Sequence, residues 1–144
     1  MLYTELTKKA LLFAWEAHEG QKDKSGMPYI FHPYEVALRQ TEEYCVCAAL
    51  LHDVIEDTAV TAEELAKEFP AEVVEAVVLL THPEGELYLD YVRRIAKNPI
   101  AAAVKRGDLA HNSDTTRLDT VDEKALERVE KYRQALRILN GEEE

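Results

Sequence analysis

Basic residues, cysteine, glycine and proline are all scarce in this sequence. The 144 residues include 17 Lys and Arg against 28 Asp and Glu, which gives a formal net charge of −11. So acidic a chain is unsuited to general binding of nucleic acid or anionic membrane, and we expect neither as a partner. An anionic small molecule would need a local patch of positive charge or a metal ion. With 5 Gly, 5 Pro and 47% hydrophobic residues, the composition is that of a globular protein rather than a disordered one.

Long hydrophobic runs and a leader-like N-terminus are also missing. No apolar run approaches the roughly 20 residues of a membrane span, and the segment MLYTELTKKALLFAW lacks the layout of a cleavable signal peptide. Cys45 and Cys47 are too close in sequence for an ordinary disulfide, and we interpret them as small core residues. These features predict a cytoplasmic protein in a reducing compartment.

The spacing of apolar and capping residues predicts an all-α fold. A helical period is clear over residues 5–19, for example, and Pro or Thr marks the start of several later helices. No segment shows sustained strand alternation, and a chain of this length fits one domain. We therefore predict a single compact bundle of about seven or eight helices over residues 1–144, with a frayed tail at 141–144. The predicted helices span residues 5–19, 33–40, 43–56, 61–69, 70–80, 87–97, 98–112 and 121–139, and a long loop covers 20–33.

The most informative segment is CVCAALLHDVIED, at residues 45–57. Its first half is entirely apolar, which predicts a helix buried on all sides. The same helix then presents one imidazole and three carboxylates, which at about 100° per residue fall within an arc of about 140°. Clustered carboxylates are costly to bury unpaired. Either a bound divalent cation or a raised carboxylate pKa must offset them, unless the segment is an ordinary solvated helix end. The four residues are His52, Asp53, Glu56 and Asp57.

A metal ion would need further ligands from elsewhere in the chain. His32 lies in FHP, where the long loop meets a short predicted helix. Asp108, His111 and Asn112 lie in VKRGDLAHN at i, i+3 and i+4, so they share one helix face. The other histidines, His18 and His82, are interpreted as structural or surface residues.

Three segments together resemble a known family. AHEGQKDKSGMPYIFHP, ALLHDVIEDT and VKRGDLAHN follow one another in the order found in HD-domain metal-dependent phosphohydrolases. The resemblance is strongest to the hydrolase domain of the Rel/Spo alarmone enzymes and to their small stand-alone relatives, the (p)ppGpp 3′-pyrophosphohydrolases. It implies hydrolysis of the 3′-pyrophosphate of ppGpp or pppGpp to GDP or GTP by a metal-activated water. The resemblance implies His32, His52, Asp53 and Asp108 as metal ligands, and Glu56 and Asp57 as the catalytic pair.

The resemblance also implies a cofactor and a substrate-binding set. Two imidazoles and two carboxylates suit Mn²⁺, the usual metal of the family, with Fe²⁺ or another divalent ion as alternatives. The substrate is a small nucleotide. His111 is expected to orient a ligand or a helix end. Local positive charge is expected from Lys22, Lys24, Lys105 and Arg106. The residues implied to bind substrate are Lys24, Asn112, Arg128 and Tyr132.

Two positions depart from the family pattern. Asp23 and Asp114 stand where the family carries arginines, one of which stacks on guanine. Both changes weaken attraction for a highly phosphorylated ligand. Two other functions therefore stay open. One is an HD phosphohydrolase for another nucleotide or phosphorylated cofactor, such as NADPH or a nucleoside monophosphate. The other is a nucleotide-sensing module that binds without turnover.

Overall fold

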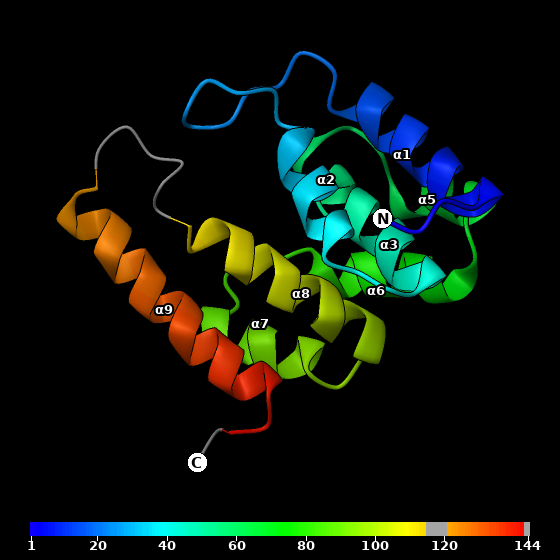
Figure 1. The fold of residues 1–144 in the computed structure, drawn as a ribbon. Coiled ribbons are helices and arrows are strands. Elements are labelled where there is room, and N and C mark those ends of the chain that lie inside the picture. The colour runs from blue at the N-terminus through cyan, green and yellow to red at the C-terminus, as the bar shows by residue number, and fades with distance from the viewer. Residues whose placement is uncertain (115–120, 143–144) are drawn as a thin grey trace.

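The predicted all-α class is confirmed by a computed structural model, which describes residues 1–114 and 121–142. Helices dominate this part of the chain (Figure 1), and the β-type pairing within it is an isolated bridge between Lys22 and Pro28. None of its helices has the length and apolar character needed to cross a bilayer. The helices are α1 (Glu5–Ala17), α2 (Phe31–Leu38), α3 (Glu43–Leu51), α4 (Val54–Asp57), α5 (Ala62–Glu68), α6 (Ala71–Leu80), α7 (Tyr88–Ile95), α8 (Pro99–Asn112) and α9 (Glu123–Leu139).

Most helix boundaries agree with the sequence because capping residues fix them. The Thr61 hydroxyl accepts a hydrogen bond from the Glu64 amide at the start of α5, and the Asn98 side chain caps α8 ahead of Pro99. At the other end of the chain, Gly141 has a φ of 75° after α9. The predicted frayed tail includes residues 143 and 144, which lie outside the described residues.

The predicted helix 43–56 is wrong as a single element. It divides into α3 and the short α4, with His52 and Asp53 in a turn between them. The cause is local: the His52 Nδ1–H donates to the carbonyl of Ala49 at 2.6 Å. A side chain that takes a backbone acceptor competes with continuation of the helix. His52 and Asp53 therefore lie between two helices, whereas the arc of carboxylates was predicted for a single helix.

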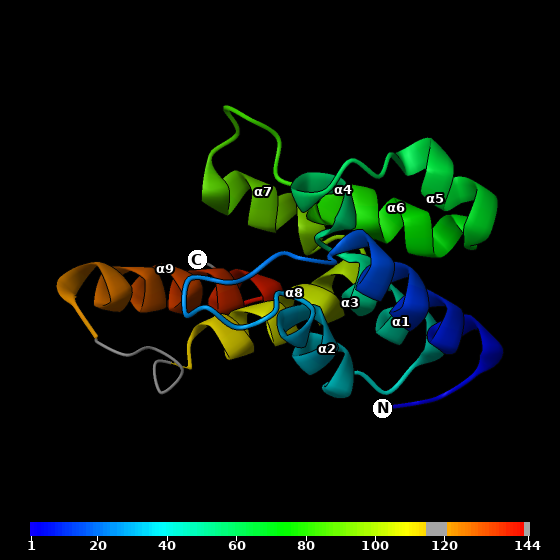
Figure 2. The ribbon, with the colours of Figure 1, turned by 90° about the horizontal axis from the view of Figure 1, so that it is seen from above.

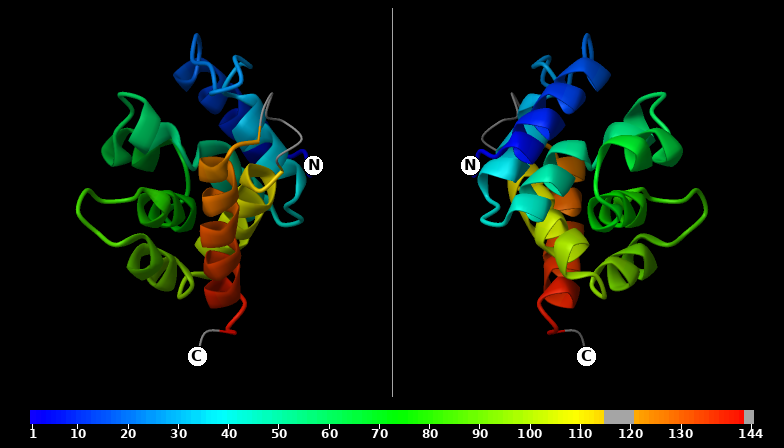
Figure 3. Two further views of the ribbon diagram at one scale, coloured as in Figure 1. Left: turned by 90° about the vertical axis from the view of Figure 1, so that its left-hand side faces the viewer. Right: turned by 90° about the vertical axis from the view of Figure 1, so that its right-hand side faces the viewer.

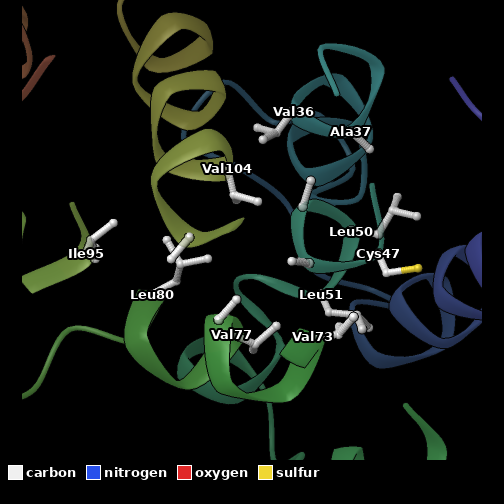
Figure 4. Packing of buried hydrophobic residues seen from close by; sticks show 14 of the residues in the cluster. Val36, Ala37, Cys47, Leu50, Leu51, Val73, Val77, Leu80, Ile95 and Val104 are labelled. Atoms are coloured by element: carbon white, nitrogen blue, oxygen red, sulfur yellow. The ribbon is translucent and has the colours of Figure 1, made fainter. Parts of the chain in front are cut away.

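Helix α3 is the centre of the hydrophobic core. Every residue from Cys45 to Leu51 is at most 7% exposed, which confirms the prediction of a helix buried on all sides. It packs against α1, α2, α6 and α8. Figure 4 shows Leu50 and Leu51 among side chains from α2, α6 and α8. Because neighbouring helices pack against α3 on every side, they fix the position of the turn at its C-terminal end.

The other helices surround α3 in two groups. Figure 2 shows α4 to α7 on one side of the molecule and α1, α2, α8 and α9 on the other. Helix α9 packs against α7 and α8, and its C-terminal end lies far from α1 and the loop that follows α1 (Figure 3). This arrangement leaves the end of α3 facing a cavity whose walls come from several helices and the 20–30 loop.

A glycine allows α2 and α8 to approach closely. A Cβ at Gly107 would lie 3.0 Å from Gln40 Nε2 and 3.1 Å from Val36 Cγ1. The close approach brings His32, at the start of α2, within hydrogen-bonding distance of Asp108 on α8.

Candidate metal centre

The four predicted metal ligands converge at the end of the core. His32 Nε2 lies 2.8 Å from Asp108 Oδ1 and 3.8 Å from Asp53 Oδ2. His52 Nε2 lies 3.1 Å from Asp53 Oδ2 and 3.6 Å from Asp108 Oδ1. Donor atoms of His32, His52 and Asp53 all lie within 4.8 Å of one another. Asp108 lies near both imidazoles, so three separate segments of the chain bring two imidazole nitrogens and two carboxylates together.

His52 provides the observation that fits a metal ion to this site. Its Nδ1 carries the proton donated to Ala49, so in the neutral ring Nε2 holds the lone pair. That Nε2 is buried and has no aligned hydrogen-bond partner among the described residues. Burial alone would lower the pKa of His52, but Asp53 and Asp108 outweigh it and raise this pKa well above its ordinary value. The two carboxylates thus stabilise a positive charge at the point that Nε2 faces. The donors match a divalent cation of borderline hardness.

Neighbouring side chains fix both carboxylates. The Tyr29 hydroxyl donates to Asp53 Oδ2 at 2.6 Å. Lys105 Nζ donates to Asp108 Oδ2 at 2.9 Å, and Asn112 Nδ2 donates to Asp108 Oδ1 at 3.0 Å. Such contacts orient carboxylates before a metal ion binds. Sequence reasoning missed Tyr29, and it assigned Asn112 to substrate rather than to a carboxylate.

His111 contacts the ring nitrogen of His32 that does not face Asp108. From this position it can orient His32. The two Nδ1 atoms are 2.8 Å apart. If His32 Nε2 is a metal ligand, His32 Nδ1 carries the proton and donates it to His111. Both imidazoles are at most 8% exposed, so this contact fixes the orientation of the His32 ring.

Lys105 lines the cavity and is also the buried ion-pair partner of Asp108. It is 8% exposed, and its ammonium lies 5.6 Å and 5.2 Å from the ring centroids of Tyr88 and Tyr91. Burial disfavours the charged form, but Asp108 outweighs it and raises the pKa of Lys105. The fixed cation offsets one of the clustered carboxylates, and the aromatic faces stabilise it.

The two candidate catalytic carboxylates lie on α4, next to the metal ligands. Glu56 and Asp57 both line the cavity. Burial raises the pKa of Glu56, and burial together with the charge of Asp53 raises that of Asp57. Glu56 Oε2 also accepts a hydrogen bond from the His82 amide at 3.4 Å. Raised carboxyl pKa values beside a metal site are typical of groups that transfer protons.

A cavity of about 640 Å³ opens in front of these groups. All four residues predicted to bind substrate line it: Lys24, Asn112, Arg128 and Tyr132. Arg106 does not, and its inclusion among the local charges was wrong, because its guanidinium donates to Asn140 Oδ1 and the carbonyl of Leu139. Of the two histidines interpreted as structural or surface residues, His82 lines the cavity and His18 is 2% exposed.

Both departures from the family pattern also lie on the cavity wall. Asp23 and Asp114 are among its lining residues. The Asp23 carboxylate has a local function, because its Oδ1 accepts hydrogen bonds from the amides of Ser25 and Met27 at 2.8 Å and 3.0 Å. Aspartate is well suited to close such a turn, which gives this residue a structural reason apart from any substrate.

Comparisons with known proteins identify the family of this chain. The HD-domain family matches residues 10–137. The chain is 36% identical over 143 residues to a GTP pyrophosphokinase of Myxococcus xanthus, covering 87% of this chain and 19% of that protein. It is 34% identical over 125 residues to a guanosine-3′,5′-bis(diphosphate) 3′-pyrophosphohydrolase of Aquifex aeolicus, covering 78% of this chain and 18% of that protein.

A solved structure shares the fold. It is described as a metazoan ortholog of SpoT that hydrolyses ppGpp, and it is similar to this chain with a TM-score of 0.73 and 24% sequence identity, over 99% of this chain and 87% of that one. The chain belongs to the HD-domain family. It spans less than a fifth of the length of the two curated relatives, at 19% and 18%.

Proposed function

We propose that this chain is a metal-dependent phosphohydrolase that removes the 3′-pyrophosphate of guanosine alarmones, ppGpp and pppGpp, and releases GDP or GTP. The observation that carries the proposal is the convergence of two histidines and two aspartates with a second pair of carboxylates in one cavity. Membership of the HD-domain family supports the reaction class. The name of the Aquifex relative supports the substrate.

The metal ion is Mn²⁺, held by His32, His52, Asp53 and Asp108. Two imidazoles and two carboxylates form a borderline-hard donor set, which favours Mn²⁺ or Fe²⁺ over ions that require thiolates. When bound, such an ion supplies Lewis acidity toward a phosphoryl oxygen and acidifies a water molecule.

Glu56 and Asp57 handle the protons of the reaction. One carboxylate orients the attacking water and accepts its proton as the water oxygen bonds to phosphorus. The other gives a proton to the leaving 3′ oxygen as its bond to phosphorus breaks. The raised pKa values of both carboxyl groups suit groups that exchange protons with water and with a leaving oxygen. No nucleophilic side chain and no covalent intermediate are required.

Cavity residues other than the ligands bind the nucleotide. Lys24 and Arg128 supply positive charge from two segments that are far apart in sequence. Lys24 lies in the 20–30 loop and Arg128 lies on α9. Tyr132, one turn after Arg128, and Asn112 supply polar contacts. These cations, with the metal ion, attract an anionic substrate to a chain whose net charge is −11.

Replacing Asp53 with alanine tests the metal assignment. Asp53→Ala should abolish Mn²⁺ binding in a calorimetric titration and abolish release of pyrophosphate from ppGpp. Asp90→Ala is the matched control, because Asp90 is exposed on α7, where it pairs with Arg93 at 2.8 Å. An Asp53 variant with full Mn²⁺ content and full turnover would show that the assignment is wrong.

A second candidate substrate is a nucleotide or phosphorylated cofactor with fewer phosphates, such as NADPH or a nucleoside monophosphate. Two aspartates on the cavity wall, Asp23 and Asp114, favour it because they repel a highly charged ligand. Turnover of such a compound in place of ppGpp would retain the metal site and change the substrate. Nucleotide binding without any turnover would favour a sensing module instead.

We also propose a cytoplasmic location and a single domain, from the state of the cysteines and the extent of the hydrophobic core. Cys45 and Cys47 are free and buried, which supports the cytoplasm as the compartment. One continuous hydrophobic core draws residues from α1 through α9, which supports a single HD-type domain over residues 1–144.

A further inference from the structure

The loop between α1 and α2 folds into a hairpin-like shape. The Tyr29 amide donates to the Gln21 carbonyl at 2.9 Å, and the Asp23 amide donates to the Met27 carbonyl at 2.8 Å. We call residues 18–29 the α1–α2 loop, with a tip at 23–27 and a stem on either side. The tip residues Asp23, Lys24 and Ser25 line the cavity. The stem lies against α4.

Helix α4 depends on contacts from outside itself. It has only four residues and follows a break in the chain, and so short a helix is not stable alone. Carbonyls in the last turn of a helix also lack partners within the helix. The carbonyl of Asp57, the final residue of α4, accepts a hydrogen bond from Gln21 Nε2 at 2.7 Å. At the other end, the Tyr29 hydroxyl donates to the side chain of Asp53, the N-cap residue.

Gln21 is itself held in position. Its Oε1 lies 2.8 Å from Nδ1 of His18, which must be the donor because the acceptor is an amide oxygen. His18 is 2% exposed and caps the C-terminal end of α1. Both groups of the Gln21 amide are therefore used, one toward α1 and one toward α4. This links α4 to a helix that packs directly on the core helix α3.

We infer that Gln21 is a positioning residue that holds the Asp57 end of α4, and with it the catalytic pair, against the α1–α2 loop. The inference rests on the proposed function in one respect, since it takes Glu56 and Asp57 as the groups that move protons. It also gives the loop two tasks. Its tip contacts the nucleotide through Lys24, and its stem fixes the carboxylates that act on the same nucleotide.

Two variants separate the two hydrogen bonds of Gln21. Gln21→Met has a similar length and removes both. Gln21→Glu keeps an acceptor for His18 but cannot donate to the Asp57 carbonyl. A single hydrogen bond contributes modestly, so each variant should lower kcat for ppGpp by about two- to tenfold. In Gln21→Met, which leaves the charge unchanged, KM for ppGpp and Mn²⁺ affinity should stay at the wild-type values, because Gln21 is not among the residues that line the cavity. Gln134→Met, at an exposed position on α9, is the control.

A second readout does not depend on activity. Amide hydrogen exchange at Asp57 and Thr58, followed by NMR, should be about two- to tenfold faster in Gln21→Met than in wild type. Exchange should be unchanged in Gln134→Met. Unchanged exchange in Gln21→Met would overturn the inference. So would a raised KM at constant kcat, which would make Gln21 a substrate contact.

The two readouts also separate this inference from the proposed function. A wild-type protein that turns over no ppGpp would remove the proposed substrate, and the exchange measurement would then decide on its own whether Gln21 holds α4. Turnover of ppGpp with unaltered kcat and exchange in both Gln21 variants would leave the proposed function intact and remove the positioning role.

Discussion

Replacing Lys105 with methionine removes the cation that pairs with a buried metal ligand. Lys105 and Asp108 are 8% and 6% exposed, and their charged atoms lie 2.9 Å apart. Water therefore screens the pair little. Methionine fills a similar volume, so the loss is electrostatic. Removing one partner of a buried pair leaves an uncompensated charge and costs about 3–5 kcal/mol. Loss of the contacts with Tyr88 and Tyr91 acts in the same direction.

The assay is urea unfolding in EDTA, followed by far-ultraviolet circular dichroism. Lys105→Met should lower the free energy of unfolding by about 3 kcal/mol, equivalent to a Tm lower by about 6–12 °C for a chain of this size. Arg133→Met is the matched control, since its pair with Glu130 has side chains 71% and 61% exposed and should contribute at most about 1 kcal/mol. A Lys105 variant that loses no more stability than the Arg133 variant would refute the reasoning.

Two further predictions concern the cavity. Glu56→Gln keeps an acceptor for the His82 amide, so the variant should retain its fold and its Mn²⁺ binding. Its kcat should fall by about 10²–10⁴-fold, as expected on loss of a general acid or base. Wild-type turnover would remove Glu56 from the mechanism. Asp23→Asn keeps an oxygen for the amides of Ser25 and Met27 while removing a negative charge. Its KM for ppGpp should therefore fall by about two- to threefold, and the change should be larger at low ionic strength. A KM that is unchanged at every salt concentration would mean that Asp23 does not face the phosphates.

The helices were predictable because their signals are local. Thr61 and Asn98 cap their helices through side-chain oxygens within three residues, and such pairs can be read from the sequence. The apolar run before His52 correctly indicated a helix buried on all sides. The break after that run was not predictable from periodicity, because it depends on one imidazole taking the carbonyl of Ala49.

The site was only partly predictable, for reasons of helix geometry and tertiary contact. Lys105 and Arg106 are adjacent on α8 and point about 100° apart; Lys105 lines the cavity, whereas Arg106 contacts the end of α9. The i, i+3 spacing of Lys105 and Asp108 was the available signal for the right one. Contacts made by Tyr29 and Gln21 with α4 join residues 24 and 36 positions apart in sequence. No local pattern predicts such contacts.

The most direct test of the account is turnover of ppGpp, pppGpp, NADPH and several nucleoside phosphates by the purified wild-type protein, each with Mn²⁺ and with EDTA. We predict release of pyrophosphate and GDP from ppGpp with Mn²⁺ and none in EDTA. Turnover of ppGpp that persists undiminished in EDTA would contradict the metal-dependent mechanism, and Mn²⁺-dependent turnover of another compound with none of ppGpp or pppGpp would contradict the proposed substrate.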